Sequence, residues 1–334
     1  MPEHHAFLNA DPADLIQPLA EMAEKNGFEV QRLGQTTKIA APLGHVTFIT
    51  KSGGADIIFS AGSNAELQVL TDLYAQRIES AGFENAMTWD SPASRVPLNQ
   101  RIAHVGSSSR ISPNFQRVRL EGDFTAFLAE GAGLHFRLLF GPTRNDWPTR
   151  DDRGVTHWPG GANAWNKPVY TVRAISPQGD WIDTDIALFK GGRTSAWCQT
   201  VQPGTEIAVT GPNGGALRRA NWLGLVGDET ALPVIYRMLD AAPPDTKGKA
   251  VLFLRDQNDA QHVDLPTYFN LEIKPMYDAD PVEALQEMSI PEQDAYVFFA
   301  AERNQVSRAR SYLKERGLPS RAFTAASYWT SPDP

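Results

Sequence analysis

The feature that most constrains the fold is the stretch from Asn221 to Asp240, which combines an apolar strand, a polar turn and the start of a helix. The apolar run over 222–226 ends at Gly227, and Thr230-Ala231-Leu232-Pro233 opens an amphipathic helix. Proline fits the first helical turn, where a missing N–H removes no hydrogen bond. A strand that turns directly into a helix presents backbone N–H groups to an anionic ligand, so this stretch predicts a nucleotide site.

Composition is that of an ordinary globular chain with two or three domains. The 334 residues are 42% hydrophobic and 21% charged, which is enough for more than one core. No apolar run approaches the ~20 residues that span a bilayer, and no basic segment followed by an apolar stretch opens the sequence. The lone cysteine, Cys198, excludes an intramolecular disulfide. We therefore expect a cytoplasmic protein that does not contact a membrane.

Charge and ligand spacing exclude several kinds of partner. The net charge of −8 argues against general affinity for nucleic acid, because such affinity needs clustered Lys and Arg. One cysteine cannot hold an iron–sulfur cluster, and His4, His5 and His45 lack the spacing of metal ligands. We expect no bound metal, no nucleic-acid partner, and a monomer or weak dimer.

The pattern along the chain predicts three domains. Residues 1–90 are expected to form a small α+β domain, with a helix after Asp11, about four short strands and a second helix capped by Ser63. Residues 98–215 are expected to form an antiparallel β-barrel, because β-prone runs alternate with Gly, Pro, Asn and Asp turns. Residues 216–334 alternate strand and helix, which predicts a doubly wound parallel sheet.

The individual elements follow from these runs. The predicted barrel strands cover 101–105, 115–120, 134–140, 169–175, 181–188 and 206–209, and those of the parallel sheet cover 223–226, 250–254, 271–273 and 295–300. A linker is expected over 89–97 and a loop, functional or mobile, over 143–167, which contains three tryptophans. A barrel followed by a nucleotide-binding α/β domain is the layout of the ferredoxin-reductase-like flavoenzymes.

Three segments within this layout carry a closer resemblance. They are Tyr170-Thr171-Val172-Arg173; Gly191-Gly192-Arg193-Thr194-Ser195-Ala196-Trp197, followed by Gln202-Pro203-Gly204-Thr205-Glu206 and Gly211-Pro212-Asn213-Gly214; and Gly227-Asp228-Glu229-Thr230-Ala231-Leu232-Pro233. The endings Gly317-Leu318-Pro319 and Ser327-Tyr328-Trp329 match as well. From about Arg101 to Trp329 the chain resembles the siderophore-interacting protein family of FAD-dependent ferric-siderophore reductases. Residues 1–90 resemble a small domain of unknown function that accompanies some of these reductases.

The resemblance implies FAD as cofactor and assigns roles to the matched residues. Tyr170 would stack on the flavin ring, Thr171 would be the catalytic residue near flavin N5, and Arg173 would donate to a phosphate. The hydroxyls and backbone N–H groups at the helix start would hold the diphosphate. The other cofactor-binding residues implied are Val172, Lys167, Phe189, Gly192, Thr194, Ser195, Trp197, Gly227, Asp228, Glu229, Thr230, Ala231 and Trp329.

Elementary physics limits two of these roles. Side chains alternate faces along a strand, so Thr171 and Arg173 are expected on one face and Tyr170 on the other. The carboxylates of Asp228 and Glu229 repel pyrophosphate. They are therefore expected to bind ribose hydroxyls or adenine, or to close the flavin pocket.

Three positions depart from the family pattern. Pro168 stands where many relatives have arginine, Phe189 where they often have histidine, and Thr330 where a basic residue usually follows Tyr-Trp. Lys167 would then supply the charge missing at Pro168. Because cations attract an anionic ferric siderophore, these departures affect the substrate assignment more than the flavin assignment. Another basic surface would come from barrel arginines, namely Arg110, Arg117, Arg119 and Arg137.

The implied activity is electron transfer from NADPH or NADH, or from reduced ferredoxin, through FAD to Fe(III) in a siderophore or other chelate, with release of Fe(II). Iron is then a substrate. Three alternatives stay open: another NAD(P)H–flavin oxidoreductase of the same architecture, which Pro168 and Thr330 favour; a non-catalytic flavin-binding regulator; and a shared fold without flavin.

Overall fold

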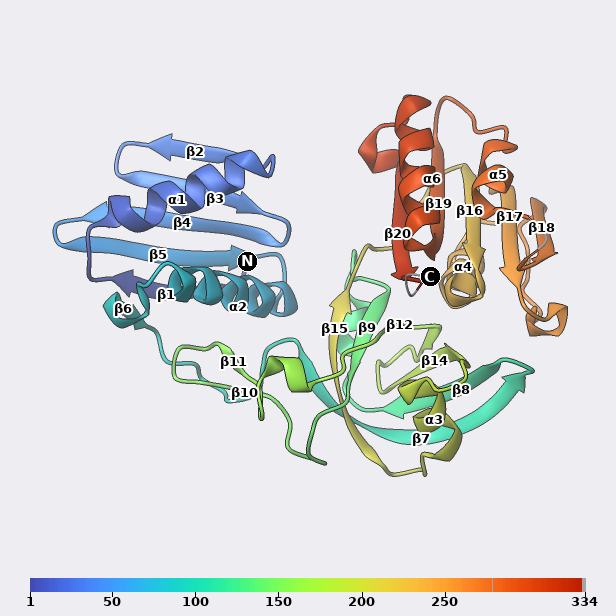
Figure 1. Cartoon of the computed structure of the whole chain (residues 1–334), viewed down its shortest axis with the longest axis horizontal. Helices are drawn as coiled ribbons and strands as arrows, with labels where there is room; N and C mark the ends of the chain where they lie inside the picture. Colours follow the sequence, from blue (N-terminus) through green and yellow to red (C-terminus); the bar gives the residue numbers. More distant parts are fainter. Residues whose placement is uncertain (278, 332–334) are drawn as a thin grey trace. The chain divides into compact units, whose positions relative to one another are not determined.

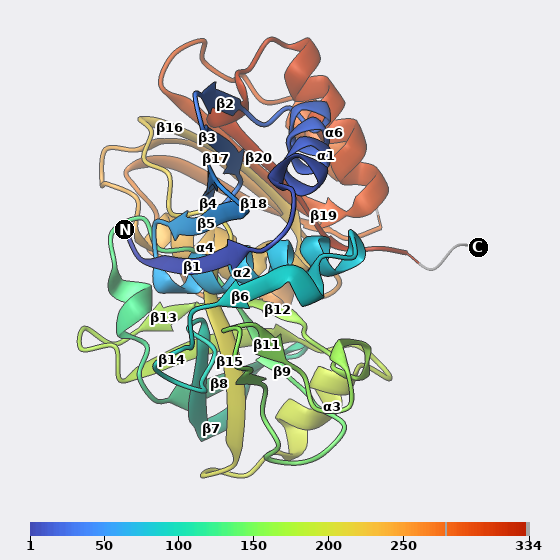
Figure 2. The ribbon, with the colours of Figure 1, turned by 90° about the vertical axis from the view of Figure 1, so that its left-hand side faces the viewer.

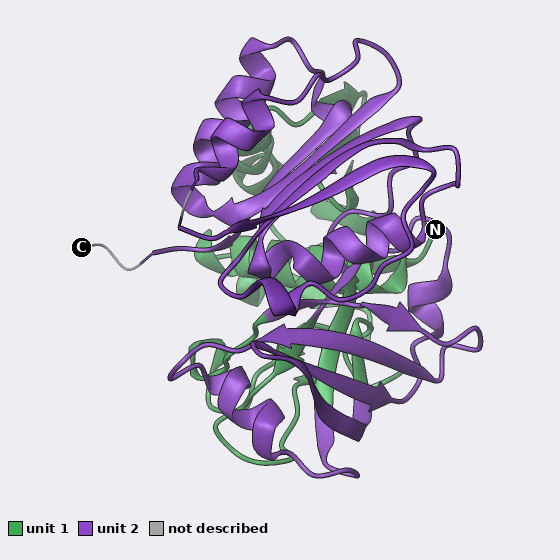
Figure 3. Cartoon of the chain, turned by 90° about the vertical axis from the view of Figure 1, so that its right-hand side faces the viewer, with its two compact units in different colours: residues 1–101, 137–168, 208–212 green, residues 102–136, 169–207, 213–334 purple. Residues whose placement is uncertain are grey.

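The computed structural model describes residues 1–277 and 279–331 (Figure 1). Two compact units are distinguished, the first comprising 1–101, 137–168 and 208–212, the second comprising 102–136, 169–207 and 213–334 (Figure 3). The N-terminal residues thus share a unit with the segment 137–168, which is far from them in sequence. The division into domains at 1–90, 98–215 and 216–334 stays a prediction.

The N-terminal part of the chain is a six-stranded sheet with two helices on one of its faces (Figures 1 and 2). Asp11 caps the first helix by accepting the Ala13 N–H, and Ser63 caps the second by accepting the Glu66 N–H. Apolar side chains of both helices and of alternate strand positions form one core. The strands, in the order β2-β3-β4-β5-β1-β6, are β1 (Glu3–Leu8), β2 (Val30–Leu33), β3 (Thr36–Ala41), β4 (Gly44–Lys51), β5 (Gly54–Ala61) and β6 (Met87–Trp89), and the helices are α1 (Pro12–Lys25) and α2 (Asn64–Ser80).

Two strands of this sheet, β1 and β6, are absent from the sequence prediction. β1 lies antiparallel to β5, and β6 pairs only with β1. Trp89, expected to begin a linker, stacks on Phe59 with ring centres 5.6 Å apart and on His4 at 5.8 Å. Both strands depend on partners distant in sequence, which local patterns do not reveal.

The antiparallel sheet of the predicted barrel has seven strands, and its two edge strands are halves of a single stretch. Val172 and Arg173 separate β12 from β13, and the Arg173 N–H donates to Asp183 O on β14 at 2.8 Å. The sheet therefore curls until it closes on itself, as a barrel does. Its strands, in the order β12-β9-β15-β7-β8-β14-β13, are β7 (Gln100–Ser112), β8 (Phe115–Glu121), β9 (His135–Leu139), β12 (Val169–Thr171), β13 (Ala174–Ile175), β14 (Trp181–Ala187) and β15 (Glu206–Asn213).

This closure corrects the expectation of one continuous strand over 169–175. The strand is interrupted at Val172, because the backbone there leaves β9 and begins to pair with β14. The expectation that Thr171 and Arg173 share one face stays a prediction.

The last part of the chain is a five-stranded parallel sheet with helices on both faces, as predicted. Side chains of α4 and alternate strand residues form one core, and those of α5 and α6 form the other. The strands, in the order β18-β17-β16-β19-β20, are β16 (Trp222–Asp228), β17 (Lys247–Leu254), β18 (Tyr268–Pro275), β19 (Ala295–Glu302) and β20 (Phe323–Trp329), and the helices are α4 (Leu232–Asp240), α5 (Pro281–Gln286) and α6 (Arg303–Glu315). The strand β20 and the short helix α5 are missing from the sequence prediction.

Gly227 sits where α4 comes closest to the sheet, and this close approach generates a stability prediction. A Cβ at this position would lie 2.5 Å from the Ala231 Cβ and 2.9 Å from the Ala300 carbonyl oxygen. Neither atom can rotate away, so Gly227→Ala should lower the free energy of unfolding by about 2–3 kcal/mol. Urea unfolding measures the loss. Gly215→Ala is the control, since an added Cβ there meets nothing within 4 Å, and equal losses in both variants would contradict the argument.

Candidate functional site

The predicted flavin strand and the short helix after β14 contribute hydroxyl groups to one region. Burial raises the pKa of Tyr170 to about 12, and Thr194, near the start of α3 (Arg193–Thr200), acts on it in the opposite direction. Ser195 Oγ accepts the Phe189 N–H at 2.9 Å. The Ser195 hydroxyl, predicted to hold a diphosphate, thus already has a partner within the chain.

The start of α3 is shaped by a glycine. A Cβ at Gly192 would lie 2.9 Å from Ser195 Oγ and 3.2 Å from the Phe189 carbonyl oxygen. Gly192 caps the helix with no side-chain hydrogen bond. The first N–H groups of a helix have no partner inside it, so this end is suited to an anion.

Arg255 connects the region of α3 to the turn after β16. Its Nε donates to Glu229 Oε2 at 2.6 Å, its Nη2 donates to Leu188 O at 2.9 Å, and its guanidinium lies 4.8 Å from the centre of the Phe189 ring. The Glu229 side chain is fully buried, and burial raises its pKa while Arg255 acts in the opposite direction. Glu229 Oε1 has no hydrogen-bond partner in the described structure, which leaves a buried acceptor open to a ligand hydroxyl or amine.

Asp228 holds the turn and the end of the chain together. Its Oδ1 accepts the Thr230 N–H at 2.8 Å and its Oδ2 accepts the Trp329 Nε1–H at 2.6 Å. Burial raises the pKa of Asp228, and these donors oppose that effect. Both oxygens are therefore used within the chain, and the expectation that phosphates do not lie against this carboxylate stays a prediction.

A histidine that the sequence analysis does not single out completes the contacts. The Val172 N–H donates to Leu134 O at 2.9 Å, which places His135 opposite Thr171 in the antiparallel register, with both side chains on one face. His135 Nε2 lies 2.8 Å from the Tyr328 hydroxyl. Burial and the nearby Arg237 lower the pKa of His135 to about 4, so its imidazole is neutral at pH 7. The only sequence signal was a histidine within a predicted strand whose other residues, apart from Arg137, are apolar.

These contacts form a closed series, which we call the contact ring. It runs from β12 through α3, Arg255, the turn after β16 and the end of β20, and returns through His135 to β12. Its members in order are Tyr170, Thr194, Ser195, Phe189, Arg255, Glu229, Asp228, Trp329, Tyr328, His135 and Thr171. Eight members of the contact ring are among the cofactor-binding residues that the resemblance implies. The other three members are Arg255, Tyr328 and His135.

The groups around the contact ring fit a flavin nucleotide. Phe189 and Trp329 expose 43% and 39% of their surfaces, as aromatic rings do when a flat ligand is to cover them. The open acceptor of Glu229 suits a hydroxyl or amine, and the glycine-shaped start of α3 suits a diphosphate.

The other residues predicted to bind the cofactor are not members of the contact ring. Arg173 forms an ion pair with Asp240 on α4 and lies 3.9 Å from Asp185, so its role toward a phosphate stays a prediction. Val172 is fully buried, and its carbonyl accepts from Arg237. Thr230, Ala231 and Gly227 shape the turn, and Trp197 is half-buried on α3.

Lys167 belongs to the other compact unit. Its Nζ donates to Ala162 O at 3.2 Å and lies 4.3 Å from the centre of the Trp158 ring. Its ammonium group therefore has partners in its own segment. The expectation that Lys167 supplies the charge missing at Pro168 stays a prediction.

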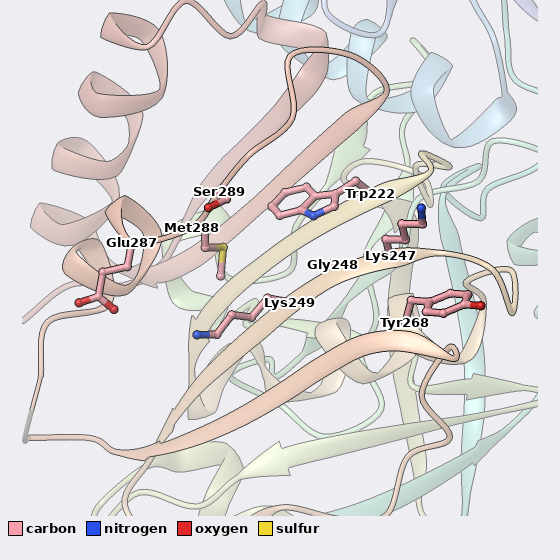
Figure 4. A pocket seen from close by; sticks show the side chains of 8 residues that line it. All are labelled: Trp222, Lys247, Gly248, Lys249, Tyr268, Glu287, Met288 and Ser289. Atoms are coloured by element: carbon pink, nitrogen blue, oxygen red, sulfur yellow. The ribbon is translucent and has the colours of Figure 1, made fainter.

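A groove of about 860 Å³ lies elsewhere on the parallel sheet (Figure 4). Trp222, Lys247 and Tyr268 line it, and each is the first residue of its strand. The turn at Gly227 lies instead at the carboxyl end of β16. Ligands of doubly wound sheets bind at the carboxyl ends of the strands, so this groove is not the nucleotide site.

Neither a metal-binding cluster nor a membrane-spanning helix is found among the described residues. No group of three or more His, Cys, Asp or Glu side chains in 1–277 and 279–331 is arranged to hold a metal ion. Within the same residues, no helix combines the length and the apolar character that crossing a membrane requires.

Comparison with known proteins identifies relatives over the last two thirds of the chain. A family model described as the siderophore-interacting FAD-binding domain matches residues 104–216, and one described as siderophore-interacting protein matches residues 220–332. Ferric vibriobactin reductase ViuB of Vibrio cholerae is 27% identical over 236 residues, covering 66% of this chain and 85% of its own. The NADPH-dependent ferric-chelate reductase of Escherichia coli K12 is 29% identical over 254 residues, covering 70% of this chain and 94% of its own.

A solved structure agrees with these relatives. The crystal structure of the siderophore-interacting protein SipS from Aeromonas hydrophila superposes with a TM-score of 0.56 at 25% identity, covering 72% of this chain and all of the other. Neither family model matches any residue before position 104. The predicted fold class, a barrel followed by a ferredoxin-reductase-like α/β domain, is confirmed.

The neutral His135 makes part of the stability depend on pH. In the unfolded chain this imidazole takes up a proton near pH 6.5, whereas in the folded chain it does so only near pH 4. Protonation between these values favours unfolding, so stability present above pH 6.5 is lost as the pH falls toward 4, by roughly 3 kcal/mol. His135→Gln should flatten this part of the dependence, as measured by urea unfolding at several pH values. His262→Gln, at a histidine whose side chain is 90% exposed, should leave the dependence unchanged, and a parallel curve for His135→Gln would contradict the assignment.

Proposed function

Because the chain belongs to the siderophore-interacting protein family, we propose that it is an FAD-dependent ferric-siderophore reductase that takes electrons from NADPH or NADH. The overall reaction balances when one NAD(P)H reduces two Fe(III) to two Fe(II) and releases one proton. The single observation that carries the proposal is the contact ring, which joins the flavin strand, α3 and the turn after β16 around groups that suit FAD.

The cofactor supplies the redox chemistry: bound FAD accepts a hydride from the nicotinamide nucleotide and passes electrons singly to iron. The chain supplies binding and orientation. Tyr170 offers an aromatic face beside Thr194, and Thr171 places a hydroxyl on the same face of the barrel as His135. Because the imidazole is uncharged, this edge of the site presents hydrogen-bonding groups without a positive charge.

The two carboxylates of the turn have separate tasks in this proposal. Asp228 caps the turn and anchors Trp329, which keeps the end of β20 against the site. Glu229 keeps one oxygen on Arg255 and offers the other to a ribityl, ribose or adenine group. Neither carboxylate needs to approach a phosphate.

The substrate surface differs from the family pattern at Pro168, Phe189 and Thr330. Of the barrel arginines considered as substitutes, Arg117 and Arg119 each donate two hydrogen bonds to an aspartate, Asp185 and Asp183 respectively. Their charges are thereby compensated. We include in the proposal a ferric chelate as substrate, and leave its charge to be found by experiment.

The proposal also includes a monomer or weak dimer without a nucleic-acid partner, for which the net charge of −8 is the support. A cytoplasmic location is part of it as well, supported by the single, buried and unpaired Cys198.

Flavin content tests the site directly. The purified chain should show flavin absorption near ~450 nm, and Tyr170→Ala should raise the Kd for FAD roughly 5-fold to 30-fold, because a stacked aromatic ring contributes on the order of 1–2 kcal/mol. Tyr268→Ala, at an exposed tyrosine in the groove of Figure 4, is the matched control. Equal FAD affinity in wild type and Tyr170→Ala would remove Tyr170 from the site.

Turnover distinguishes this reductase from related flavoenzymes. With NADPH or NADH, we expect faster steady-state reduction of a ferric siderophore than of ferredoxin or free flavin, and Thr171→Ala should slow flavin reduction by the nucleotide. Stopped-flow absorbance measures reduction of the flavin, and the absorbance of a complex with a ferrous-iron chelator measures formation of Fe(II). Faster reduction of free flavin or ferredoxin would favour another NAD(P)H–flavin oxidoreductase, and a bound flavin that no donor reduces would favour a regulator.

A further inference from the structure

The segment between β9 and β12 contains a small hairpin. It consists of β10 (Thr149–Arg150) and β11 (Thr156–His157), paired antiparallel. Asp151 organises the turn, since its Oδ1 accepts the N–H groups of Arg153 at 2.9 Å and of Val155 at 3.0 Å. Gly154 adopts a positive φ of 74°, a conformation that favours glycine. The expected loop over 143–167 thus has an ordered centre.

The helix α2 of the N-terminal domain binds this hairpin through two side chains. Gln68, only 1% exposed, donates from Nε2 to Gly154 O at 3.0 Å and to Thr156 Oγ1 at 3.2 Å. Asp72 accepts the Thr156 N–H at 2.8 Å and the Thr156 hydroxyl at 2.6 Å. Every donor here faces an acceptor, which is the requirement for polar groups at a buried interface.

The strand β1 and the residues after β6 extend the same interface. His4 Nε2 lies 2.9 Å from Arg153 O, and burial lowers the pKa of His4, so a neutral imidazole donates to this carbonyl. The Arg95 side chain donates from Nη1 to Arg150 O at 3.2 Å, and the Arg95 backbone carbonyl oxygen accepts the Arg150 N–H at 2.6 Å. We call Gln68, Asp72, His4 and Arg95 the hairpin socket.

The hairpin fits the socket without spare room. A Cβ at Gly154 would lie 2.8 Å from Arg150 Nη2 and 3.0 Å from His4 Nε2. The Arg150 side chain is itself buried and donates from Nε to Gly154 O at 3.1 Å. Such contacts select one conformation of the hairpin and disfavour alternatives that would leave these polar groups unpaired.

The residues that follow the hairpin, 158–168, pack on one another. Trp158 and Trp165 pack edge to face with ring centres 5.5 Å apart, and Trp165 Nε1 donates to Pro159 O at 2.9 Å. Lys167 lies over the Trp158 ring, as described above. This packed segment ends at Pro168, and the next residue, Val169, begins the strand that carries Tyr170.

We propose that the N-terminal domain is an intramolecular positioning domain: its hairpin socket binds residues 149–157 of the same chain and thereby holds the segment leading to Tyr170 in the conformation that binds flavin. The first half of this inference is independent of the proposed function, and the second half rests on it.

Hydrogen–deuterium exchange on the full chain tests the docking. Thr156→Val removes the hydroxyl that donates to Asp72, and Gln68→Ala removes the donor to Gly154. Amides of residues 150–157 should exchange at least tenfold faster in both variants. Thr149→Val and Gln76→Ala, at exposed positions of the same hairpin and helix, are matched controls and should exchange like wild type. Because Thr156 lies on the hairpin, its variant decides the question even if Gln68→Ala fails to fold.

Fluorescence titration with FAD tests the positioning. The Kd for FAD should rise about threefold to tenfold in Thr156→Val and Gln68→Ala, and stay unchanged in the two controls. Unchanged exchange in both variants would overturn the docking, and faster exchange with an unchanged Kd would overturn the positioning. If the wild-type chain takes up no FAD, the proposed function falls together with the positioning, while the exchange comparison still decides the docking.

Discussion

Closure of the barrel at Val172 and Arg173 is the constraint on which the candidate site depends. The chain leaves one neighbouring strand, β9, and joins the next, β14, within these two residues. Tyr170 consequently reaches α3, Thr171 lies opposite His135, and Arg173 is turned toward the carboxylates of α4 and β14. Three neighbouring residues of one motif thus have three different environments.

The second part of the site depends on a close approach of helix and strand. Gly227 lets the short 3-10 turn Glu229–Ala231, which leads into α4, pack closely against β16, and the two carboxylates of Asp228 and Glu229 are occupied mainly inside the chain. Asp228 attaches the last strand, and Glu229 attaches Arg255 and so the region of α3. An acidic turn is compatible with a nucleotide site here because its charge is compensated or used before any ligand arrives.

The N-terminal domain has a core of its own and also binds a segment some eighty residues later in the chain. Its socket includes two buried polar side chains, Gln68 on α2 and His4 on β1, whose polar groups the hairpin satisfies. The tryptophans of the segment, which by composition alone resemble a mobile or substrate-binding loop, pack mostly on one another. A domain without catalytic residues can thus contribute to a reductase through the geometry of one loop.

The sequence alone determined the order of architectures, the family and most of the contact ring, because strand and helix periodicity and the glycine-rich turns are local properties. It could not reveal β1, β6 or β20, since these strands exist only through pairing with distant partners. Nor could it show that His135 faces Thr171 or that Gln68 binds Thr156. Such juxtapositions are set by sheet register and helix packing, which depend on contacts between residues far apart in the chain, and therefore only the tertiary structure decided them.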